Sequence, residues 1–156
     1  MSIKARLLAL GVSTALAVTG TLVYQFEGES KVPYKDIVQV PTVCVGSTSN
    51  VVLSKIYTEL ECTERFAKDL RTAESGVNSC TPNLPEGPRI AFTSFAFNVG
   101  TNAYCRSTLA KKALAGDLRG ACKELTRWVY AGKEVVPGLV KRRLAEQAVC
   151  YGGYHE

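Results

Sequence analysis

The feature that most constrains this chain is an uncharged, largely apolar run over residues 7–26, with the sequence LLALGVSTALAVTGTLVYQF. As a single helix the run would rise about 30 Å, which matches the hydrocarbon core of a bilayer. Lys4 and Arg6 precede it, and this predicts that the N-terminus stays inside while the remainder is exported. The sequence therefore predicts one N-terminal transmembrane signal-anchor helix within residues 1–26, followed by a domain over residues 27–156.

The run is only weakly hydrophobic, and three interpretations of its fate are open. Its small or polar residues include Gly11, Ser13, Thr14, Thr19, Gly20 and Thr21. One interpretation is a cleaved signal peptide, because Ala15-Leu16-Ala17 has the small-x-small form of a cleavage site. The second is a permanent anchor, and the third is an export signal that stays attached and later leaves the membrane. All three place residues 27–156 outside the cytoplasm.

Six cysteines follow the run, and they indicate the same oxidising compartment. They are Cys44, Cys62, Cys80, Cys105, Cys122 and Cys150. None forms a Cys-x-x-Cys pair and the single histidine, His155, lies at the tail, so we expect no zinc site. Wide spacing favours disulfides in an exported protein over buried thiols in a cytosolic one. Short loops that bracket helix pairs suggest the pairing Cys44–Cys62, Cys80–Cys105 and Cys122–Cys150.

Charge and composition narrow the function classes only partly. The net charge is +5, from 19 Lys and Arg against 14 Asp and Glu. This mild excess favours an anionic partner, whether nucleic acid, anionic lipid or an acidic cell-wall polymer, but no basic block is long enough to choose among them. Because 46% of the residues are hydrophobic, we expect a packed core and no extended disorder.

The pattern beyond the run predicts an α+β fold that is mainly helical with a small β-hairpin subregion. Residues 32–46 are rich in Val, Ile, Tyr and Thr and are broken by Pro33 and Pro41, which indicates short strands and turns. A loop is expected over residues 79–88. Helices are expected over residues 51–60, 63–75 with Thr63 as N-cap, 89–99, 107–115, 118–130 and 139–151. The segment 89–99 is apolar all round and should be buried.

Glu27, Asp36 and Thr42 form an acid–acid–hydroxyl set in this strand-forming region. Glycosidic bond cleavage needs one carboxyl group that donates a proton and a second, ionised one that supports a water molecule or the developing cation. Glu27, at the edge of an apolar segment, suits the acid, and Asp36, in a polar hairpin, suits its ionised partner.

The residues around this set resemble the phage-type lysozymes, or endolysins. The resemblance begins with Glu27-Gly28, Tyr34-x-Asp36, Thr42, Gly46 and Thr48. It continues through Ser94-Phe95-x-Phe97-Asn98-x-Gly100, Ser107-Thr108-Leu109, Gly116-Asp117, Ala121, Trp128 and Pro137-Gly138-Leu139-x-x-Arg142-Arg143-x-x-Glu146. These motifs occur in order from Glu27 almost to the C-terminus. The N-terminal run further resembles the signal-arrest-release subgroup, in which a weak transmembrane helix exports the enzyme, holds it inactive and later lets go.

The resemblance implies a lysozyme-like domain that hydrolyses the β-1,4 bond between N-acetylmuramic acid and N-acetylglucosamine without a metal or cofactor, and so lyses the host cell. Glu27 would be the general acid, and Asp36 and Thr42 would position the attacking water. Asn98 would line the glycan groove with an arginine of the pair Arg142 and Arg143 near the carboxylates, while the other arginine is expected on a solvated face.

The resemblance also implies partners and a location. The partners would be peptidoglycan and, before release, the inner membrane through residues 7–26, with no nucleic acid and a monomeric enzyme. The domain would lie in the periplasm, first tethered and then released, and after release residues 7–26 should pack on it as a helix. The other hypothesis is a membrane-tethered peptidoglycan-binding module without catalytic activity.

Two positions depart from the family's pattern. Gln39 stands where these enzymes commonly have a turn glycine, and Ser47 stands where they commonly have a histidine. All three catalytic positions are intact, but both changes bear on how firmly the hairpin holds Asp36 and Thr42.

Overall fold

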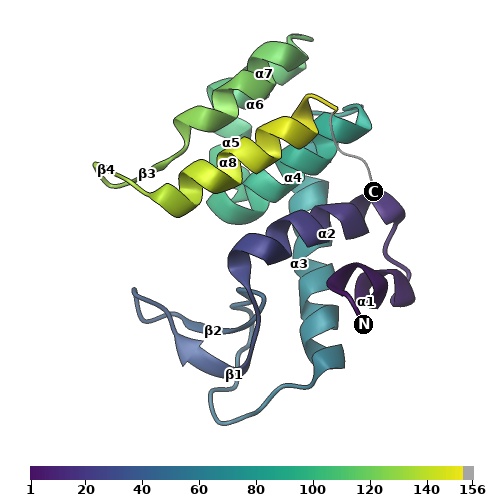
Figure 1. The fold of residues 1–156 in the computed structure, drawn as a ribbon, viewed down its shortest axis with the longest axis vertical. Helices are drawn as coiled ribbons and strands as arrows, with labels where there is room; N and C mark the ends of the chain where they lie inside the picture. The colour runs from purple at the N-terminus through teal and green to yellow at the C-terminus, as the bar shows by residue number, and fades with distance from the viewer. Residues whose placement is uncertain (153–156) are drawn as a thin grey trace. The chain divides into compact units, whose positions relative to one another are not determined.

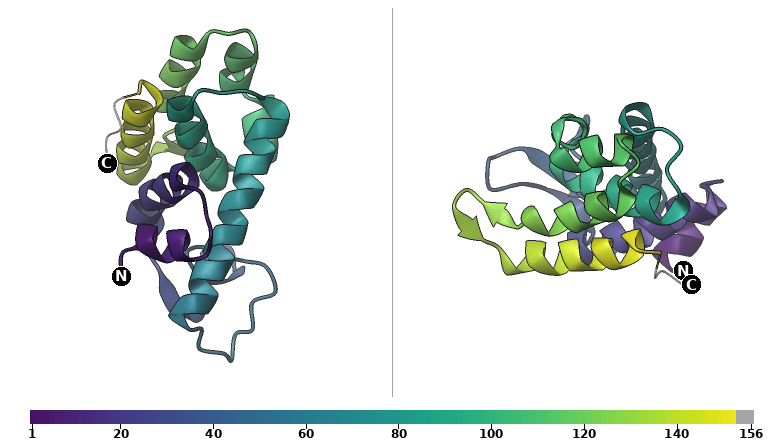
Figure 2. Two further views of the ribbon diagram at one scale, coloured as in Figure 1. Left: turned by 90° about the vertical axis from the view of Figure 1, so that its right-hand side faces the viewer. Right: turned by 90° about the horizontal axis from the view of Figure 1, so that it is seen from above.

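The computed structural model describes residues 1–152, which form two compact units that divide after Arg71 (Figures 1 and 2). Both units are mainly helical, and each contains a small antiparallel β-hairpin. The predicted α+β class is therefore confirmed. The second hairpin, over residues 130–135, lies between the helices expected over residues 118–130 and 139–151, and only Tyr130 falls within an expected helix.

The apolar run forms parts of two helices and not the single helix that was expected. α1 (Ile3–Ala9) and α2 (Thr14–Glu27) are joined by a turn in which Gly11 has a φ of 81°, a left-handed conformation that suits glycine. Ser2 and Ser13 are the N-caps, and each side chain accepts a backbone N–H hydrogen bond. Within residues 1–152, no helix has the length and apolar character needed to cross a membrane.

Both helices pack into the first unit. Their buried side chains include Leu7, Leu16, Ala17, Val18, Leu22 and Val23. The contact is closest at Gly20, where an added Cβ would lie 2.4 Å from Leu7 Cδ1 and 3.0 Å from Leu70 Cδ1. Gly20 therefore lets α2 approach both α1 and the first half of α3 (Glu59–Cys80), and Figure 2 shows the three helices together.

The first hairpin follows α2 directly. β1 (Ser30–Lys35) pairs antiparallel with β2 (Pro41–Cys44), and Tyr34 lies opposite Thr42. The turn between the strands closes with hydrogen bonds from Asp36 N to Val40 O, 3.0 Å, and from Gln39 N to Asp36 O, 2.9 Å. The prediction of short strands in this region is confirmed.

The helix expected over residues 51–60 is wrong, because these residues mostly form turns and irregular backbone before α3 begins at Glu59. Tyr57 explains their conformation: its N–H donates to Lys31 O of β1, 2.9 Å, and its hydroxyl accepts from Val52 N, 3.0 Å. Tyr57 is also buried beside Val43. Tertiary contacts with the hairpin thus outweigh the local helical pattern.

α3 is longer than expected, and its N-terminus lies at Thr58 instead of Thr63. Thr58 and Glu61 form a reciprocal capping box: Glu61 N donates to Thr58 Oγ1, 3.1 Å, and Thr58 N donates to Glu61 Oε1, 3.0 Å. Thr63 lies inside the helix, where its hydroxyl donates to Glu59 O. The helix continues through Cys80, so the loop expected over residues 79–88 is shorter than predicted.

The second unit is built around α4 (Glu86–Val99), which packs against α8 (Pro137–Cys150). Phe92 and Phe95 of α4 are fully buried, as the apolar pattern of this segment predicted. The other elements are α5 (Thr101–Arg106), α6 (Thr108–Leu114), α7 (Leu118–Glu124), a 3-10 turn (Leu125–Arg127), β3 (Tyr130–Ala131) and β4 (Glu134–Val135). The helix expected over residues 118–130 therefore ends early, because a hairpin turn with Gly132 at φ 62° follows.

The three disulfides have the expected pairing. Cys44–Cys62 joins β2 to α3, Cys80–Cys105 joins the end of α3 to α5, and Cys122–Cys150 joins α7 to α8. The bonded cysteines are 18, 25 and 28 residues apart, and closing loops of this size stabilises a fold by about 3 kcal/mol each in the chain-entropy account.

Candidate active site

Glu27, Asp36 and Thr42 all belong to the first unit, where they lie at the end of α2 and in the first hairpin. Glu27 is the last residue of α2 and its side chain is exposed. The helix ends there because Gly28 has a φ of 70°, while its N–H still bonds to Tyr24 O at 3.0 Å. The chain then turns directly into β1, so Glu27 stands where the helix meets the hairpin.

The Asp36 carboxylate is held by the turn that it begins. Its Oδ1 accepts hydrogen bonds from Val38 N and Val40 N, both at 2.9 Å. Such a turn fixes the side chain relative to its own backbone. Both bonds go to one oxygen, and among residues 1–152 no further hydrogen bond reaches the side chain, so Oδ2 can accept a bond from a ligand or water.

Thr42 is oriented by a hydrogen bond to the backbone of Val40, one of the two residues that also hold Asp36. Its side chain is buried, and Oγ1 donates to Val40 O at 2.9 Å. Val40 therefore bonds to both residues, through its N–H to Asp36 and through its carbonyl to Thr42. With its proton used in this way, the Thr42 hydroxyl presents acceptor lone pairs to a neighbouring group.

The loop after β2 lies beside the Glu27 carboxylate. An added Cβ at Gly46 would lie 3.4 Å from Glu27 Oε2. Gly46 has a φ of 64°, and Cys44 has a φ of 62° in the same tight loop, which closes through two hydrogen bonds between Val43 and Ser47 at 2.9 Å. The Cys44–Cys62 disulfide ties this loop to α3, which agrees with a structural role for Cys44.

Gln39, which stands where the family commonly has a turn glycine, still adopts the backbone conformation of that turn. Gln39 adopts φ 66°, so the turn keeps the left-handed conformation although the residue has a side chain. This conformation costs a non-glycine residue about 1–2 kcal/mol. The hydrogen bonds around Asp36 still form, so the departure lowers stability without removing the geometry of the turn.

Ser47, the second departure, is buried and has its own hydrogen-bond partners. Its hydroxyl accepts from Arg65 Nη1 at 3.1 Å and hydrogen-bonds to Asp69. Arg65 also donates to the carbonyls of Ser49, 2.6 Å, and Asn50, 3.1 Å. These residues line a small cavity of about 200 Å³. Burial raises the pKa of Asp69, and the Ser47 hydrogen bond opposes this shift. Arg65 and Asp69 were not predicted, because only tertiary structure brings them to residue 47.

Asn98, Arg142 and Arg143 form a second cluster, in the other unit. The expectation of a solvated arginine is wrong, since Arg142 is 3% exposed and Arg143 is 1% exposed. Both pair with the fully buried Glu146, Arg142 through Nε at 3.3 Å and Arg143 through Nη1 at 2.6 Å. The i+3 and i+4 spacing places all three on one face of α8. Glu146, which belongs to the Arg142-Arg143-x-x-Glu146 motif but was given no role from sequence, organises this cluster.

Arg143 also holds Asn98 in place. Its Nη2 donates to Asn98 Oδ1, its Nε donates to Trp128 O at 2.9 Å, and its guanidinium stacks 4.8 Å from the Phe95 ring centroid. Burial lowers the pKa of Arg143, while Glu146 opposes the shift. Asn98 itself is exposed at the end of α4. A buried arginine thus orients an exposed amide, and the predicted contact of Asn98 with substrate stays a prediction.

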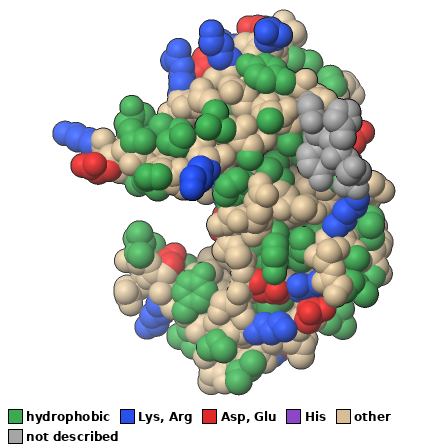
Figure 3. Space-filling view, viewed as in Figure 1, with side chains coloured by type: hydrophobic (Ala, Val, Ile, Leu, Met, Phe, Trp, Pro, Cys, Tyr) green, Lys and Arg blue, Asp and Glu red, His purple; other side chains and the backbone are tan. Residues whose placement is uncertain are grey.

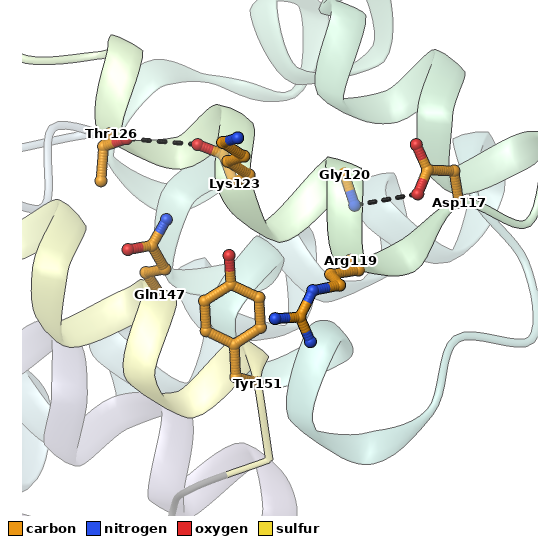
Figure 4. A pocket seen from close by; sticks show the side chains of 7 residues that line it. All are labelled: Asp117, Arg119, Gly120, Lys123, Thr126, Gln147 and Tyr151. Carbon is orange, nitrogen blue, oxygen red and sulfur yellow. Dashed lines mark hydrogen bonds between the residues drawn. The ribbon is translucent and has the colours of Figure 1, made fainter.

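The larger cavity of about 580 Å³ lies elsewhere in the second unit (Figure 4). Arg119, Lys123, Gln147 and Tyr151 line it, with the Arg119 guanidinium 5.7 Å from the Tyr151 ring centroid. Its only carboxylate, Asp117, caps α7 by accepting from Gly120 N at 2.9 Å. Because acid–base hydrolysis of a glycoside needs two carboxyl groups, this cavity is not the candidate active site.

Basic side chains gather over the α6–α7 end of the second unit (Figure 3). Exposed members are Lys111, Arg119, Lys123 and Arg127. They account for part of the positive net charge and favour contact with an anionic polymer. Within residues 1–152 no group of acidic, histidine or cysteine residues could hold a metal ion, and His155 lies outside the described residues.

Comparisons with known proteins point to one family. The family model for phage lysozyme matches residues 24–146. A SAR-endolysin of Enterobacteria phage PA-2 is 44% identical over 129 residues, which is 81% of this chain and 78% of the relative. A SAR-endolysin of Escherichia phage Mu is 34% identical over 154 residues, or 94% of this chain and 90% of the relative, so its similarity reaches into the residues before Glu27.

The fold is similar to that of P1 phage endolysin Lyz in its active form. The TM-score is 0.84 at 24% identity, covering 98% of this chain and 95% of that one. The secreted inactive form of the same endolysin is less similar, with a TM-score of 0.59 at 21% identity, covering 90% of this chain and 96% of that one.

Proposed function

This chain belongs to the phage lysozyme family and is an endolysin, a muramidase that cleaves host peptidoglycan, and from this premise we propose how its residues carry out and control the reaction. The observation that carries the proposal is the arrangement of Glu27, Asp36 and Thr42 within one unit. An exposed carboxylate at a helix end stands beside a hairpin that holds a second carboxylate and a hydroxyl through the backbone N–H and C=O of one residue, Val40.

We propose that Glu27 is the general acid. Its proton passes to the oxygen of the β-1,4 bond between N-acetylmuramic acid and N-acetylglucosamine as that bond breaks. Asp36 Oδ2 and Thr42 Oγ1 hold the water that attacks the anomeric carbon. The water's oxygen forms the new C–O bond and its proton passes to Asp36. The bonds from Val38 N and Val40 N to Asp36 Oδ1 support this role, because they hold the carboxylate by one oxygen and leave Oδ2 to accept from the water.

In the second unit, Asn98 is proposed to contact the glycan. Its Oδ1 is occupied by Arg143, so the amide NH₂ is the group that faces outward as a donor for a sugar hydroxyl or acetamide oxygen. Arg142 and Arg143 then serve the site by orientation, because both guanidinium groups are buried around Glu146. The exposed basic residues over α6 and α7 suit the acidic character of the cell wall.

Residues 7–26 are proposed to act as a signal-arrest-release segment. In the host they first span the inner membrane with the remainder of the chain in the periplasm, and later leave the bilayer. The uncharged run of membrane length supports the first state. The packing of α1 and α2 into the first unit, and the greater likeness to the active form of the P1 endolysin, support the second.

The test is the release of new reducing ends from purified peptidoglycan by the purified chain. Glu27→Gln should lower the rate by about 10²–10⁴, which is the usual contribution of a positioned general acid, and leave thermal unfolding unchanged because Glu27 is exposed. Glu64→Gln is the matched control, since Glu64 is an exposed glutamate of the same unit and lies outside the site. A Glu27→Gln enzyme as fast as the control would show that the acid lies elsewhere.

A further inference from the structure

Arg6, which precedes the apolar run, is buried in the first unit and makes an extensive set of hydrogen bonds. Its side chain is 7% exposed. Nη1 and Nη2 donate to the two carboxylate oxygens of Glu29 at 3.1 Å and 2.8 Å, and Nε donates to Thr63 Oγ1 at 2.9 Å. Nη2 also reaches Glu59 O at 3.3 Å. The bidentate geometry fixes the carboxylate in one plane with the guanidinium.

Glu29 connects this arginine to the region of the catalytic acid. It lies two residues after Glu27, between the end of α2 and the start of β1. Its Oε1 accepts a further hydrogen bond from the Tyr24 hydroxyl at 3.2 Å. We call this arrangement the Arg6–Glu29 clamp: one carboxylate joins α1 through Arg6 to α2 through Tyr24, and Arg6 extends the link to α3 through Thr63.

The clamp acts on a part of the backbone that has little other support. Gly28 separates Glu27 from Glu29, has a φ of 70°, and has no neighbouring atom within 4 Å of the position of an added Cβ. α2 fixes Glu27 from the N-terminal side. On the C-terminal side, the first anchored side chain is that of Glu29, which is 12% exposed. The direction in which the chain leaves Glu27 therefore depends on where Glu29 is held.

A gain in stability would be a weak explanation for a buried ion pair such as Arg6–Glu29. Removing two charges from water costs much of what their attraction returns, so apolar residues of similar volume often stabilise a fold equally well. The hydrogen bonds from Arg6 lower the pKa of Glu29, which shows that the carboxylate is held in its charged form despite its burial. A buried pair of this kind is better suited to fixing a position.

We propose that Arg6 is a positioning residue for the muramidase reaction, which through Glu29 sets the placement of the Glu27 carboxylate. The inference deepens the proposed function and depends on it. If residues 7–26 formed one membrane helix, Arg6 and Glu29 would be separated by its length of about 30 Å. In the folded unit Arg6 Nη2 lies 2.8 Å from Glu29 Oε2. The clamp therefore forms only after the run has left the bilayer, and the tethered enzyme lacks it.

The test uses the purified, folded chain and two variants. Arg6→Met leaves Glu29 buried without its ion-pair partner, and it should lower kcat. Arg6→Met/Glu29→Met removes both charges, so it should unfold at or near the parental temperature. Its kcat should still fall by about 10–100-fold, as expected when a catalytic group is misplaced by about 1 Å, with KM unchanged. Arg6→Lys, which keeps the charge but loses the bidentate bond, should recover part of kcat.

Two controls separate positioning from general destabilisation. Lys55→Met breaks the more exposed Lys55–Glu61 pair of the same unit and should leave kcat unchanged. Leu70→Ala removes a fully buried side chain near Gly20 and lowers stability without touching the clamp, so its kcat should stay parental below its unfolding temperature. A stable Arg6→Met/Glu29→Met variant with parental kcat would overturn the inference alone. A parent chain that releases no reducing ends would overturn the proposed function as well.

Discussion

Replacing Gly20 with alanine tests whether the N-terminal helices need a close approach in order to pack into the first unit. The new Cβ would lie 2.4 Å from Leu7 Cδ1 and 3.0 Å from Leu70 Cδ1. Both leucines are fully buried, and so is Phe66, whose ring lies 3.4 Å from the same point. None of these side chains can move into solvent to make room.

The expected change in stability is the difference between two opposing effects. Alanine in place of glycine within a helix stabilises it by about 1 kcal/mol. Inserting a methyl group into a packed core costs about 1–3 kcal/mol. Gly20→Ala should therefore lower the free energy of unfolding by about 0–2 kcal/mol. Leu7→Ala should lose about 2–5 kcal/mol by itself, and much less in combination with Gly20→Ala, because the methyl group then fills part of the space.

The assay is urea unfolding of the purified chain with its disulfides intact. The matched control is Gly138→Ala near the start of α8, which is exposed and has no atom within 4 Å of the added Cβ. That variant should gain up to about 1 kcal/mol. If Gly20→Ala were as stabilising as Gly138→Ala, and independent of Leu7, the close approach of α1, α2 and α3 would not be a requirement of packing.

The same position tests release in the host. Gly20→Leu makes the run more apolar, and it also adds four carbon atoms at a point where one is too many. Both effects favour the membrane state over the packed state, so lysis should be delayed. Lysis at the parental time would contradict the proposed release step.

Two further substitutions test buried polar groups. Thr93→Val should raise the free energy of unfolding by about 1 kcal/mol, because within residues 1–152 the buried Thr93 Oγ1 has no hydrogen-bond partner; a loss on urea unfolding would show that the hydroxyl is used. Asp69→Asn should stabilise the protein at neutral pH, because burial raises the pKa of Asp69 above its ordinary value of 3.8 and so favours the neutral form in the folded state. The parent should match the variant below that value and lose relative stability as pH rises through the raised pKa, so a difference in Tm that is constant from pH 3 to 7 would refute the reasoning.

Much of the candidate site could be predicted because it is local in sequence. Asp36 and Thr42 lie on either side of one hairpin turn, and Glu27 ends the helix that leads into it. The disulfide pairing was equally accessible, since each bond joins two cysteines that follow one another in the sequence, 18, 25 and 28 residues apart. The start of α3 was missed although its signal, Thr58-x-x-Glu61, is present in the sequence.

Other features could not be read from local patterns. A basic pair such as Arg142-Arg143 looks the same in sequence whether it faces water or the interior. Its burial depends on Glu146 one turn away and on groups from other elements, namely Asn98 of α4 and the carbonyl of Trp128. The role of Ser47 likewise depends on Arg65 and Asp69 of α3.

The sequence by itself determined that most apolar side chains of residues 7–26 would be removed from water, because hydrating an uncharged apolar run of this length raises the free energy. It did not determine which surroundings would bury them, since a lipid bilayer and a protein core are both apolar. In the tertiary structure the run packs into the protein. The helix is interrupted at Gly11, α2 approaches α1 and α3 closely at Gly20, and Arg6 pairs with Glu29. Those contacts join residues that lie far apart in the chain, so they exist only once the first unit has folded.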